Sequence, residues 1–202
     1  MIEKITRNLQ AHLTESELHT LSESRVANLA RSLKQIVGQR GKTEFKEYEQ
    51  MVSNVYLSKY NHRQERNADK ASQQQQQSEE GETDNPEEGH VISKENLAIR
   101  EALQDLKKEY NEEYLVEDAL FKTDFYIPSA KLAIEINGKT HYYPYTTRFN
   151  NFTNLKMKTL RQAGVNVLNL NSWTLEGFIR NDNRNGLKDL LQKTIATYEN
   201  GG

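Results

Sequence analysis

Residues 132–143 read LAIEINGKTHYY, an apolar strand pattern followed by a polar loop. The apolar residues on both sides of Glu135 predict a buried strand with one carboxylate inside it. Asn137 and Gly138 then predict a turn that tolerates positive φ, and the loop after it carries basic, aromatic and histidine side chains. The segment therefore predicts a strand that delivers polar chemistry to the edge of a sheet.

Patterns on both sides of this strand predict a compact α/β domain. Asp124 lies inside the second of two short upstream strands. Downstream, a helix is expected to end at Gly164, in the left-handed conformation that glycine favours. The expected elements, in order, are a helix over about 94–110, strands over 113–121 and 122–128, a tight turn at Ser129-Ala130, the strand 131–136, a helix through 155–161, a strand over 165–171, a short turn around 173–178 and a helix over 186–198.

The first 70 residues predict helices only. Ser22 can cap one helix, which Gly38 would end, and another begins near Thr43. Such a helical hairpin cannot bury its apolar faces alone, so it belongs to a helical-repeat array, docks on the later domain or binds a protein partner. We interpret the stripe on the later helix as packing rather than as a platform for RNA bases; it comprises Phe45, Tyr48, Val52 and Tyr56. An earlier helix has its apolar residues at Ile2, Ile5, Leu9 and Leu13.

A polar segment separates the two regions. Residues 73–90 read QQQQQSEEGETDNPEEGH and carry six acids and no base. Without apolar side chains to bury, such a segment cannot offset its ordering entropy, so it predicts a disordered tether, with a functional acidic segment as the alternative. The expected organisation is a helical segment over 1–70, a disordered Gln/Glu-rich linker over 71–92 and an α/β domain over 93–199.

Composition excludes several classes of protein. The 202 residues are 28% charged with a mean hydropathy of -0.89, which limits the size of the core. There is no apolar run of the roughly 18 residues that a membrane span requires. The absence of cysteine excludes disulfides and zinc-thiolate sites, which favours an intracellular compartment without fixing it.

The charge is distributed unevenly within the second region. Residues 122–161 contain seven basic residues and only two acids, whereas residues 91–121 contain four basic residues and eight acids. Cations bind phosphates and aromatic rings stack on unpaired bases, so this surface suits a polyanion such as RNA. An ordinary mixed surface with tyrosines filling a loop is the alternative. The candidate RNA-binding residues are Lys139, His141, Tyr142, Arg148, Lys156, Lys158 and Arg161.

Two segments together resemble a known family. They are TDFYIPSAKLAIEINGKTHYY, residues 123–143, and FTNLKMKTLRQAGVNVLNLNSWTLEGF, residues 152–178. They are similar to the RAP domain, an RNA-binding module that is abundant in apicomplexans and lies at the C-terminus of FAST kinase-like organelle proteins. The resemblance spans about residues 94–195. The family pattern is matched, in order, by Asp124, Glu135, Gly138, His141, Lys158, Arg161, Gly164, Val165, Val167 and Trp173.

RAP domains are similar in fold to PD-(D/E)XK and very-short-patch-repair nucleases, which implies a restriction-endonuclease-like domain. Such nucleases hold Mg²⁺ with carboxylates from adjacent strands. Asp124 and Glu135 match that arrangement, but the third position is the neutral Asn137, and Lys139 is out of step on the strand. The alternative is a structural role, in which the two carboxylates pair with Lys or Arg on the following helix or cap turns. We therefore expect no cofactor, with Mg²⁺ required only by a nuclease, and an enzyme is not the favoured interpretation.

Three functions remain open at this stage. The first is RNA binding, on organellar (mitochondrial) RNA or as an accessory within a ribonucleoprotein. The second is a structural subunit of a mitochondrial assembly such as the ribosome, which would contact its neighbours through the N-terminal helices. The third is a nuclease. Typical RAP proteins have a longer helical-repeat region than the roughly 70 residues here, which favours an accessory role. The resemblance implies a mitochondrial location, with the cytoplasm as the alternative; residues 1–13 are amphipathic and basic, but Glu3 weakens their interpretation as a targeting segment.

Overall fold

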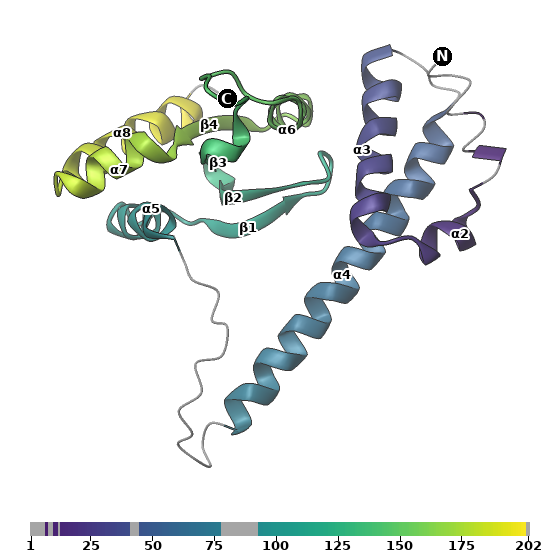
Figure 1. Ribbon diagram of the computed structural model, residues 1–202. Helices are drawn as coiled ribbons and strands as arrows, with labels where there is room; N and C mark the ends of the chain where they lie inside the picture. The colour runs from purple at the N-terminus through teal and green to yellow at the C-terminus, as the bar shows by residue number, and fades with distance from the viewer. Residues whose placement is uncertain (1–6, 8–9, 12, 41–44, 78–92, 201–202) are drawn as a thin grey trace. The chain divides into compact units, whose positions relative to one another are not determined.

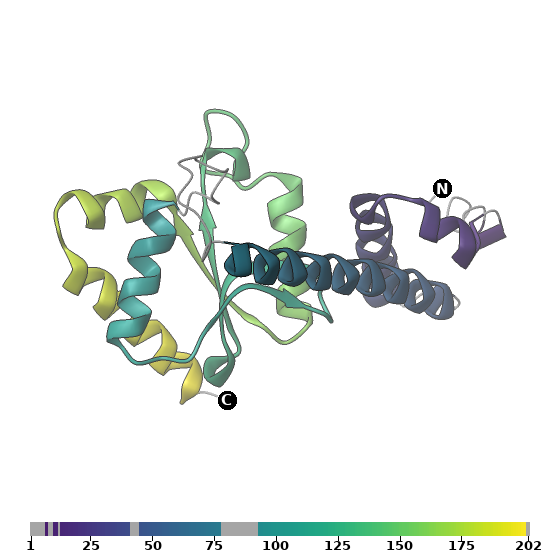
Figure 2. The same ribbon diagram turned by 90° about the horizontal axis from the view of Figure 1, so that it is seen from below.

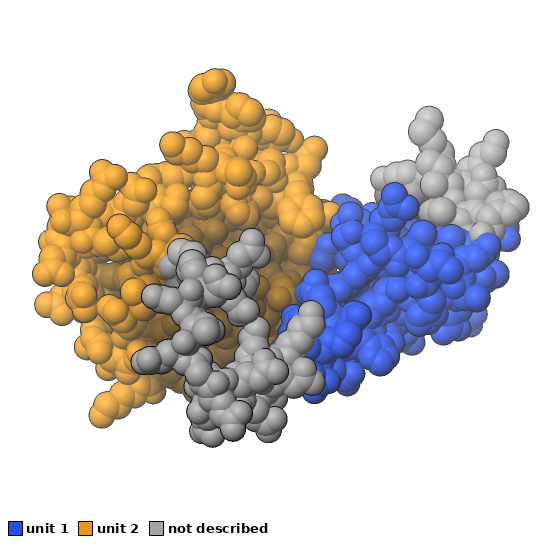
Figure 3. Space-filling model, turned by 60° about the horizontal axis from the view of Figure 1, so that its bottom comes forward, with its two compact units in different colours: residues 1–87 blue, residues 88–202 orange. Residues whose placement is uncertain are grey.

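The computed structural model describes residues 7, 10–11, 13–40, 45–77 and 93–200 (Figure 1). The chain divides into two compact units, residues 1–87 and residues 88–202 (Figure 3). The mixed α+β class expected from the sequence is confirmed, with helices first and an α/β region after them. None of the helices in the described part of the chain is both long and apolar enough to cross a membrane.

The first unit contains the helices α2 (Glu15–Thr20), α3 (Glu23–Arg40) and α4 (Lys46–Gln77). A capping box starts α2, in which Thr14 Oγ1 accepts from Glu17 N at 3.4 Å and Glu17 Oε2 accepts from Thr14 N at 2.7 Å. The stripe expected on α4 is a packing surface, since each of its residues is at most 6% exposed: Phe45, Tyr48, Val52 and Tyr56. Ile2, Ile5 and Leu9 of the expected first helix lie outside the described residues.

Two boundaries in this unit differ from the sequence prediction. The helix α3 does not end at Gly38 but continues to Arg40. A glycine inside an exposed helix costs only about 1 kcal/mol, which the packed turns before it offset. The helix α4 continues through residues 71–77, which the prediction assigned to the linker, and the remaining linker residues, 78–92, lie outside the described residues.

The second unit is a four-stranded sheet covered by helices on both faces. Its strands are β1 (Asn111–Val116), β2 (Phe121–Ile127), β3 (Leu132–Asn137) and β4 (Asn166–Asn171), and its helices are α5 (Lys94–Asp105), α6 (Asn151–Gln162), α7 (Ser172–Arg180) and α8 (Arg184–Glu199). Short 3₁₀ turns, η2 (Pro128–Ala130) and η3 (Lys139–His141), flank β3. The strand order is β1-β2-β3-β4; the first three strands are antiparallel, and β4 lies parallel to β3.

The alternation of side chains on β3 separates two cores. Leu132 and Ile134 join the larger core with α5, α7 and α8, whereas Ala133 packs with Leu160 of α6 on the opposite face. Figure 2 shows the same two layers, with the green α6 on one side of the sheet and the teal α5 with the yellow-green α7 and α8 on the other. Glu135 has the same parity as Ala133, so it is buried on the α6 side.

Four local predictions in this unit were wrong. The helix α5 ends at Asp105 and not near residue 110. Residues 117–120 form the turn between β1 and β2, with Leu120 at φ 55°, and do not continue a strand. Residues 172–180 form α7, because Asn171 caps this helix by accepting from Thr174 N at 2.8 Å. Gly138 has φ -77°, so the chain after β3 needs no glycine there. The expected left-handed glycine is confirmed at Gly164, with φ 76°.

Candidate functional site

The two predicted carboxylates lie opposite each other on neighbouring strands. In the antiparallel pairing of β2 with β3, Phe125 faces Ile134, so the next pair is Asp124 and Glu135. Opposite residues project from the same face of a sheet, about 5 Å apart at Cβ. Asp124 Oδ2 accepts the backbone N–H of Ile136 at 2.6 Å, which fixes the orientation of its carboxyl group. Burial raises the pKa of Asp124, and that hydrogen bond opposes the rise.

Glu135 is paired with a lysine from α6. The Lys156 ammonium donates to Glu135 Oε2 at 2.5 Å, and the Glu135 side chain is only 2% exposed. Burial raises the pKa of Glu135 from its ordinary 4.5 to about 7, against the opposing attraction of Lys156. The structure thus has the pairing with a cation of the following helix that the structural alternative proposed for Glu135. Lys156 was predicted as an RNA contact, and most of its side chain is buried against the sheet.

Asn137 completes the polar face of β3. It is fully buried, and its Nδ2 donates to Asn169 Oδ1 of β4 at 3.2 Å. Two buried side-chain oxygens in the described part of the chain accept no hydrogen bond, and they are Glu135 Oε1 and Asn137 Oδ1. A buried acceptor without a donor costs about 1–3 kcal/mol. A water, a donor group or a cation beside these two oxygens would remove that cost.

His141 belongs to the same cluster. It lies in η3, and its Nδ1 is 3.4 Å from Thr153 Oγ1 of α6. Burial, followed by the charge of Lys156, lowers the pKa of His141, which favours the neutral imidazole. Its electrostatic partners also include Asp124. The predicted RNA-binding set therefore divides, because His141 and Lys156 face the carboxylates.

The remaining predicted cations lie on the surface. Lys139, Arg148, Lys158 and Arg161 are exposed. The loop before α6 holds Arg148 in place, since Tyr143 N donates to Arg148 O at 2.9 Å and the guanidinium lies 5.8 Å from the centre of the Tyr143 ring. Tyr142 is half-buried, and its ring stacks on Phe149 with centroids 4.8 Å apart.

An open groove of about 530 Å³ runs beside α6. Its described lining has two cations and no acid; the residues are Phe149, Asn154, Met157, Lys158, Arg161, Gln162 and Asn169. Asn169 connects this groove to the buried cluster, because it accepts the hydrogen bond from Asn137. The groove therefore combines positive charge with an aromatic ring, and Asn169 joins its lining to the buried cluster by one hydrogen bond.

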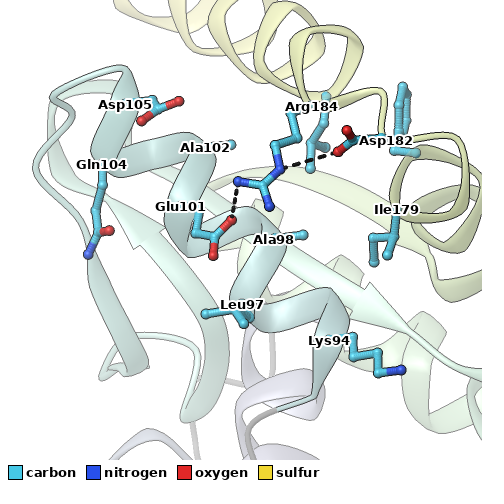
Figure 4. A pocket seen from close by; sticks show the side chains of 12 residues that line it. Lys94, Leu97, Ala98, Glu101, Ala102, Gln104, Asp105, Ile179, Asp182 and Arg184 are labelled. Atoms are coloured by element: carbon cyan, nitrogen blue, oxygen red, sulfur yellow. Dashed lines mark ion pairs between the residues drawn. The ribbon is translucent and has the colours of Figure 1, made fainter.

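A second groove lies among α5, α7 and α8, on the other face of the sheet (Figure 4). Its volume is about 340 Å³, and Arg184 reaches between Glu101 and Asp182, at 3.2 and 3.6 Å. Leu97 and Ile179 give it apolar walls. With Asp105 also on its lining, acids outnumber bases there, so this groove does not suit a polyanion.

The family model of the RAP domain matches residues 134–193. A RAP domain therefore occupies this part of the chain. The resemblance drawn from the two sequence segments is confirmed, over a narrower range than the 94–195 expected. Within the RAP domain lie Glu135, Asn137, Lys156 and the exposed cations, whereas Asp124 on β2 precedes it.

Two further comparisons concern whole proteins and solved structures. The catalytic domain of the homing endonuclease I-Bth0305I is 23% identical, with a TM-score of 0.40, over 53% of this chain and 98% of that chain. No curated protein is significantly similar to this chain.

The sequence prediction missed two participants in this site, Asn169 and the role of Trp173, and it did not specify which cation pairs with Glu135. The partnership of Lys156 with Glu135 had a local signal, since Lys156 lies three residues after Thr153 and four before Leu160, both on the inner stripe of α6. A lysine on an apolar stripe is a candidate for a buried partner. Asn169 had no comparable signal, because its contact with Asn137 depends on the register of β3 and β4. Trp173, in the family pattern, was given no role, and its ring lies 5.1 Å from that of Tyr142.

Proposed function

We propose that this chain binds RNA through the surface formed by the loop before α6 and the outer side of α6. The main evidence is the groove beside α6, whose described lining holds Lys158 and Arg161 and no acid. The RAP domain supports RNA as the polyanion. Lys139 and Arg148 extend the positive charge along the loop. Cations in such an arrangement hold phosphates and release condensed counterions.

The chain acts, in this proposal, as an accessory within a ribonucleoprotein on organellar, and specifically mitochondrial, RNA. The likeness of the sequence segments to RAP domains of organelle proteins supports the location. The first unit supports the accessory role, since the side chains of α4 over residues 64–69 are exposed and mostly polar. Such a helix offers a surface to a protein partner.

The test compares two double variants with the same change in net charge. In Lys158→Gln/Arg161→Gln the groove loses both cations, whereas Lys188→Gln/Lys193→Gln removes two cations from α8 on the other face. The affinity for a single-stranded RNA is measured from 50 to 300 mM KCl. We expect the groove variant to bind more weakly, with a salt slope smaller by about 0.7 for each lost phosphate contact. Equal affinities and slopes for the two variants would contradict the proposed surface.

A nuclease is the second candidate, and the buried cluster favours it. The carboxylates of Asp124 and Glu135, the ammonium of Lys156 and the amide of Asn137 meet on one face of the sheet, and Glu135 Oε1 and Asn137 Oδ1 accept no hydrogen bond. The oxygens of Asp124, Glu135 and Asn137 would hold a divalent cation, which in such sites stabilises the charge of a phosphoryl group. The fit is incomplete: Asn137 is neutral, Lys156 already pairs with Glu135, and no three His, Cys, Asp or Glu side chains in the described part of the chain are grouped to hold a metal.

Cleavage assays separate this candidate from simple binding. Single- and double-stranded RNA and DNA are incubated with the protein and Mg²⁺ or Mn²⁺, alongside Glu135→Gln. Divalent-dependent cleavage that disappears in Glu135→Gln would establish the nuclease. Cleavage that persists in the variant would indicate a contaminant, and RNA binding without cleavage would leave the first proposal alone.

The structural-subunit alternative requires a different measurement. A protein that serves as a fixed part of a mitochondrial assembly migrates with that assembly on native fractionation. RNase treatment distinguishes the two roles, because an accessory held through RNA is released, and a subunit held by protein contacts is retained. Migration as a free monomer before RNase treatment would count against both roles.

A further inference from the structure

Trp173, the single tryptophan of the chain, lies beside the proposed RNA surface. It is in the first turn of α7, and 44% of it is exposed. The residue belongs to neither of the two apolar cores of the second unit. Tryptophan carries one of the largest apolar surfaces of any side chain, so its exposure beside a charged surface suggests a partner.

Three aromatic rings form a ladder that ends at this residue. The Tyr142 ring lies 4.8 Å from that of Phe149, with planes 25° apart, and 5.1 Å from that of Trp173, with planes 50° apart. Phe149 in turn lines the basic groove. The ladder therefore leads from α7 to the groove that Lys158 and Arg161 also line.

The backbone around the ladder holds the rings in place. Tyr142 and Phe149 form an isolated antiparallel bridge, and Asn150 N donates to His141 O at 2.9 Å. At the other end, Asn171 caps α7 and pairs in register with Asn137 at the end of β3. The rings thus start from fixed positions at one edge of the sheet, so a ligand would find them preorganised.

We propose that Trp173, backed by Tyr142 and Phe149, is a stacking site for an unpaired base of single-stranded RNA. The inference rests on the proposed RNA binding and specifies its substrate as single-stranded. Each base presents a π-face that stacks on an aromatic ring, and the neighbouring phosphates meet the cations of α6. In a duplex the bases are stacked on one another, so Trp173 would have no face to contact.

Tryptophan fluorescence provides a direct readout, because Trp173 is the only source of that signal. We expect a single-stranded oligonucleotide to quench the fluorescence on binding, with a midpoint equal to the affinity measured by anisotropy. The same oligonucleotide annealed to its complement is expected to quench the fluorescence little. The comparison is made at the same fraction of protein bound and, separately, at the same oligonucleotide concentration. Equal quenching by both forms would overturn the single-strand assignment.

Substitutions supply the second readout. Trp173→Ala is expected to weaken single-strand binding about 5- to 150-fold, the range for one stacked base, and Trp173→Phe to restore part of the loss. The salt slope stays as in the wild type, because the cations are unchanged. Phe152→Ala is the matched control, since Phe152 is 53% exposed on α6 and its ring contacts Phe121 outside the ladder.

The outcomes distinguish this inference from the proposal beneath it. Suppose that the wild type binds RNA without a change in its tryptophan fluorescence, and that Trp173→Ala binds RNA equally well. The stacking site is then wrong and RNA binding stands. If the wild type binds no RNA, both are wrong. Circular dichroism and an unchanged salt slope show that a weakened Trp173→Ala variant is still folded.

Discussion

Lys156 Nζ and Glu135 Oε2 lie 2.5 Å apart, across the interface between α6 and β3. The carboxylate is 2% exposed and the ammonium side chain is 15% exposed. A charge buried this deeply is stable only when an opposite charge or a proton accompanies it. The pair therefore ties the helix that carries the basic groove to the strand at the centre of the sheet.

Replacing Lys156 is expected to destabilise the fold more than replacing Lys158, two positions later on α6. Lys156→Met leaves the Glu135 charge without its partner and should cost about 3–5 kcal/mol at pH 8. Lys158→Met removes an exposed cation and should cost no more than about 0.5 kcal/mol. Urea unfolding of both variants measures the difference. Similar losses for the two variants would show that the pair contributes nothing beyond a surface contact.

The pH dependence of stability reports the same pair. The folded protein holds a proton on Glu135 up to a pKa of about 7, whereas the unfolded chain releases it near 4.5. Stability from this group is therefore complete below pH 4.5 and declines as the pH rises through 7, by on the order of 3 kcal/mol. We expect Glu135→Gln to show a shallower decline than the wild type in urea unfolding between pH 5 and pH 8. Parallel curves would contradict the raised pKa.

The order of strands and helices was largely readable from the sequence, because hydrophobic period is a local property. Apolar side chains around Glu135 predicted β3, and Gly164 marked the end of α6. The helix α7 was missed because its pattern is short and its start depends on the cap from Asn171. Gly38 was wrongly predicted to end its helix, because the local sequence does not reveal whether a helix continues past a glycine.

The candidate site was predicted in its members rather than in its pairings. Asp124, Glu135 and Asn137 were recognised as one polar group on adjacent strands. The contact of Glu135 with Lys156 joins residues 21 positions apart, and that of Asn137 with Asn169 joins residues 32 positions apart. The apolar stripe of α6 marks Lys156 as a buried lysine, but no local pattern identifies its partner. Both contacts depend on how α6 crosses the sheet and on the β3–β4 register.

Two glycines provide a matched test of backbone conformation. Gly164 ends α6 at φ 76°, whereas Gly177 is inside α7, and neither has an atom within 4 Å of an added Cβ. Gly164→Ala should therefore cost about 1–2 kcal/mol through backbone strain alone. Gly177→Ala should stabilise by about 0.5–1 kcal/mol, since alanine favours a helix. Thermal unfolding of both variants checks the opposite signs, and a shared sign would mean that one of the two conformations is misassigned.

RNA binding is expected to be independent of divalent ions. The proposed contacts come from protein cations and aromatic rings, so EDTA should leave the affinity for single-stranded RNA unchanged at constant ionic strength. Filter binding with EDTA and with Mg²⁺ measures this, with KCl adjusted to match. A loss of affinity in EDTA that Mg²⁺ restores would bring the carboxylate cluster into the binding site.

The carboxylate cluster itself can be tested by adding the charge that it lacks. Asn137→Asp places a third carboxylate on the face that holds Asp124 and Glu135, and it should lower the melting temperature in EDTA because one more buried charge is unpaired. Mg²⁺ or Mn²⁺ should restore stability, by about 1.4 kcal/mol at ten times the Kd. Asn171→Asp is the control, because Asn171 is the register partner of Asn137 but its side chain caps α7, where aspartate is equally suited. If divalent ions stabilise neither variant, the three side chains do not share a cation position, and the nuclease candidate loses its ligand set.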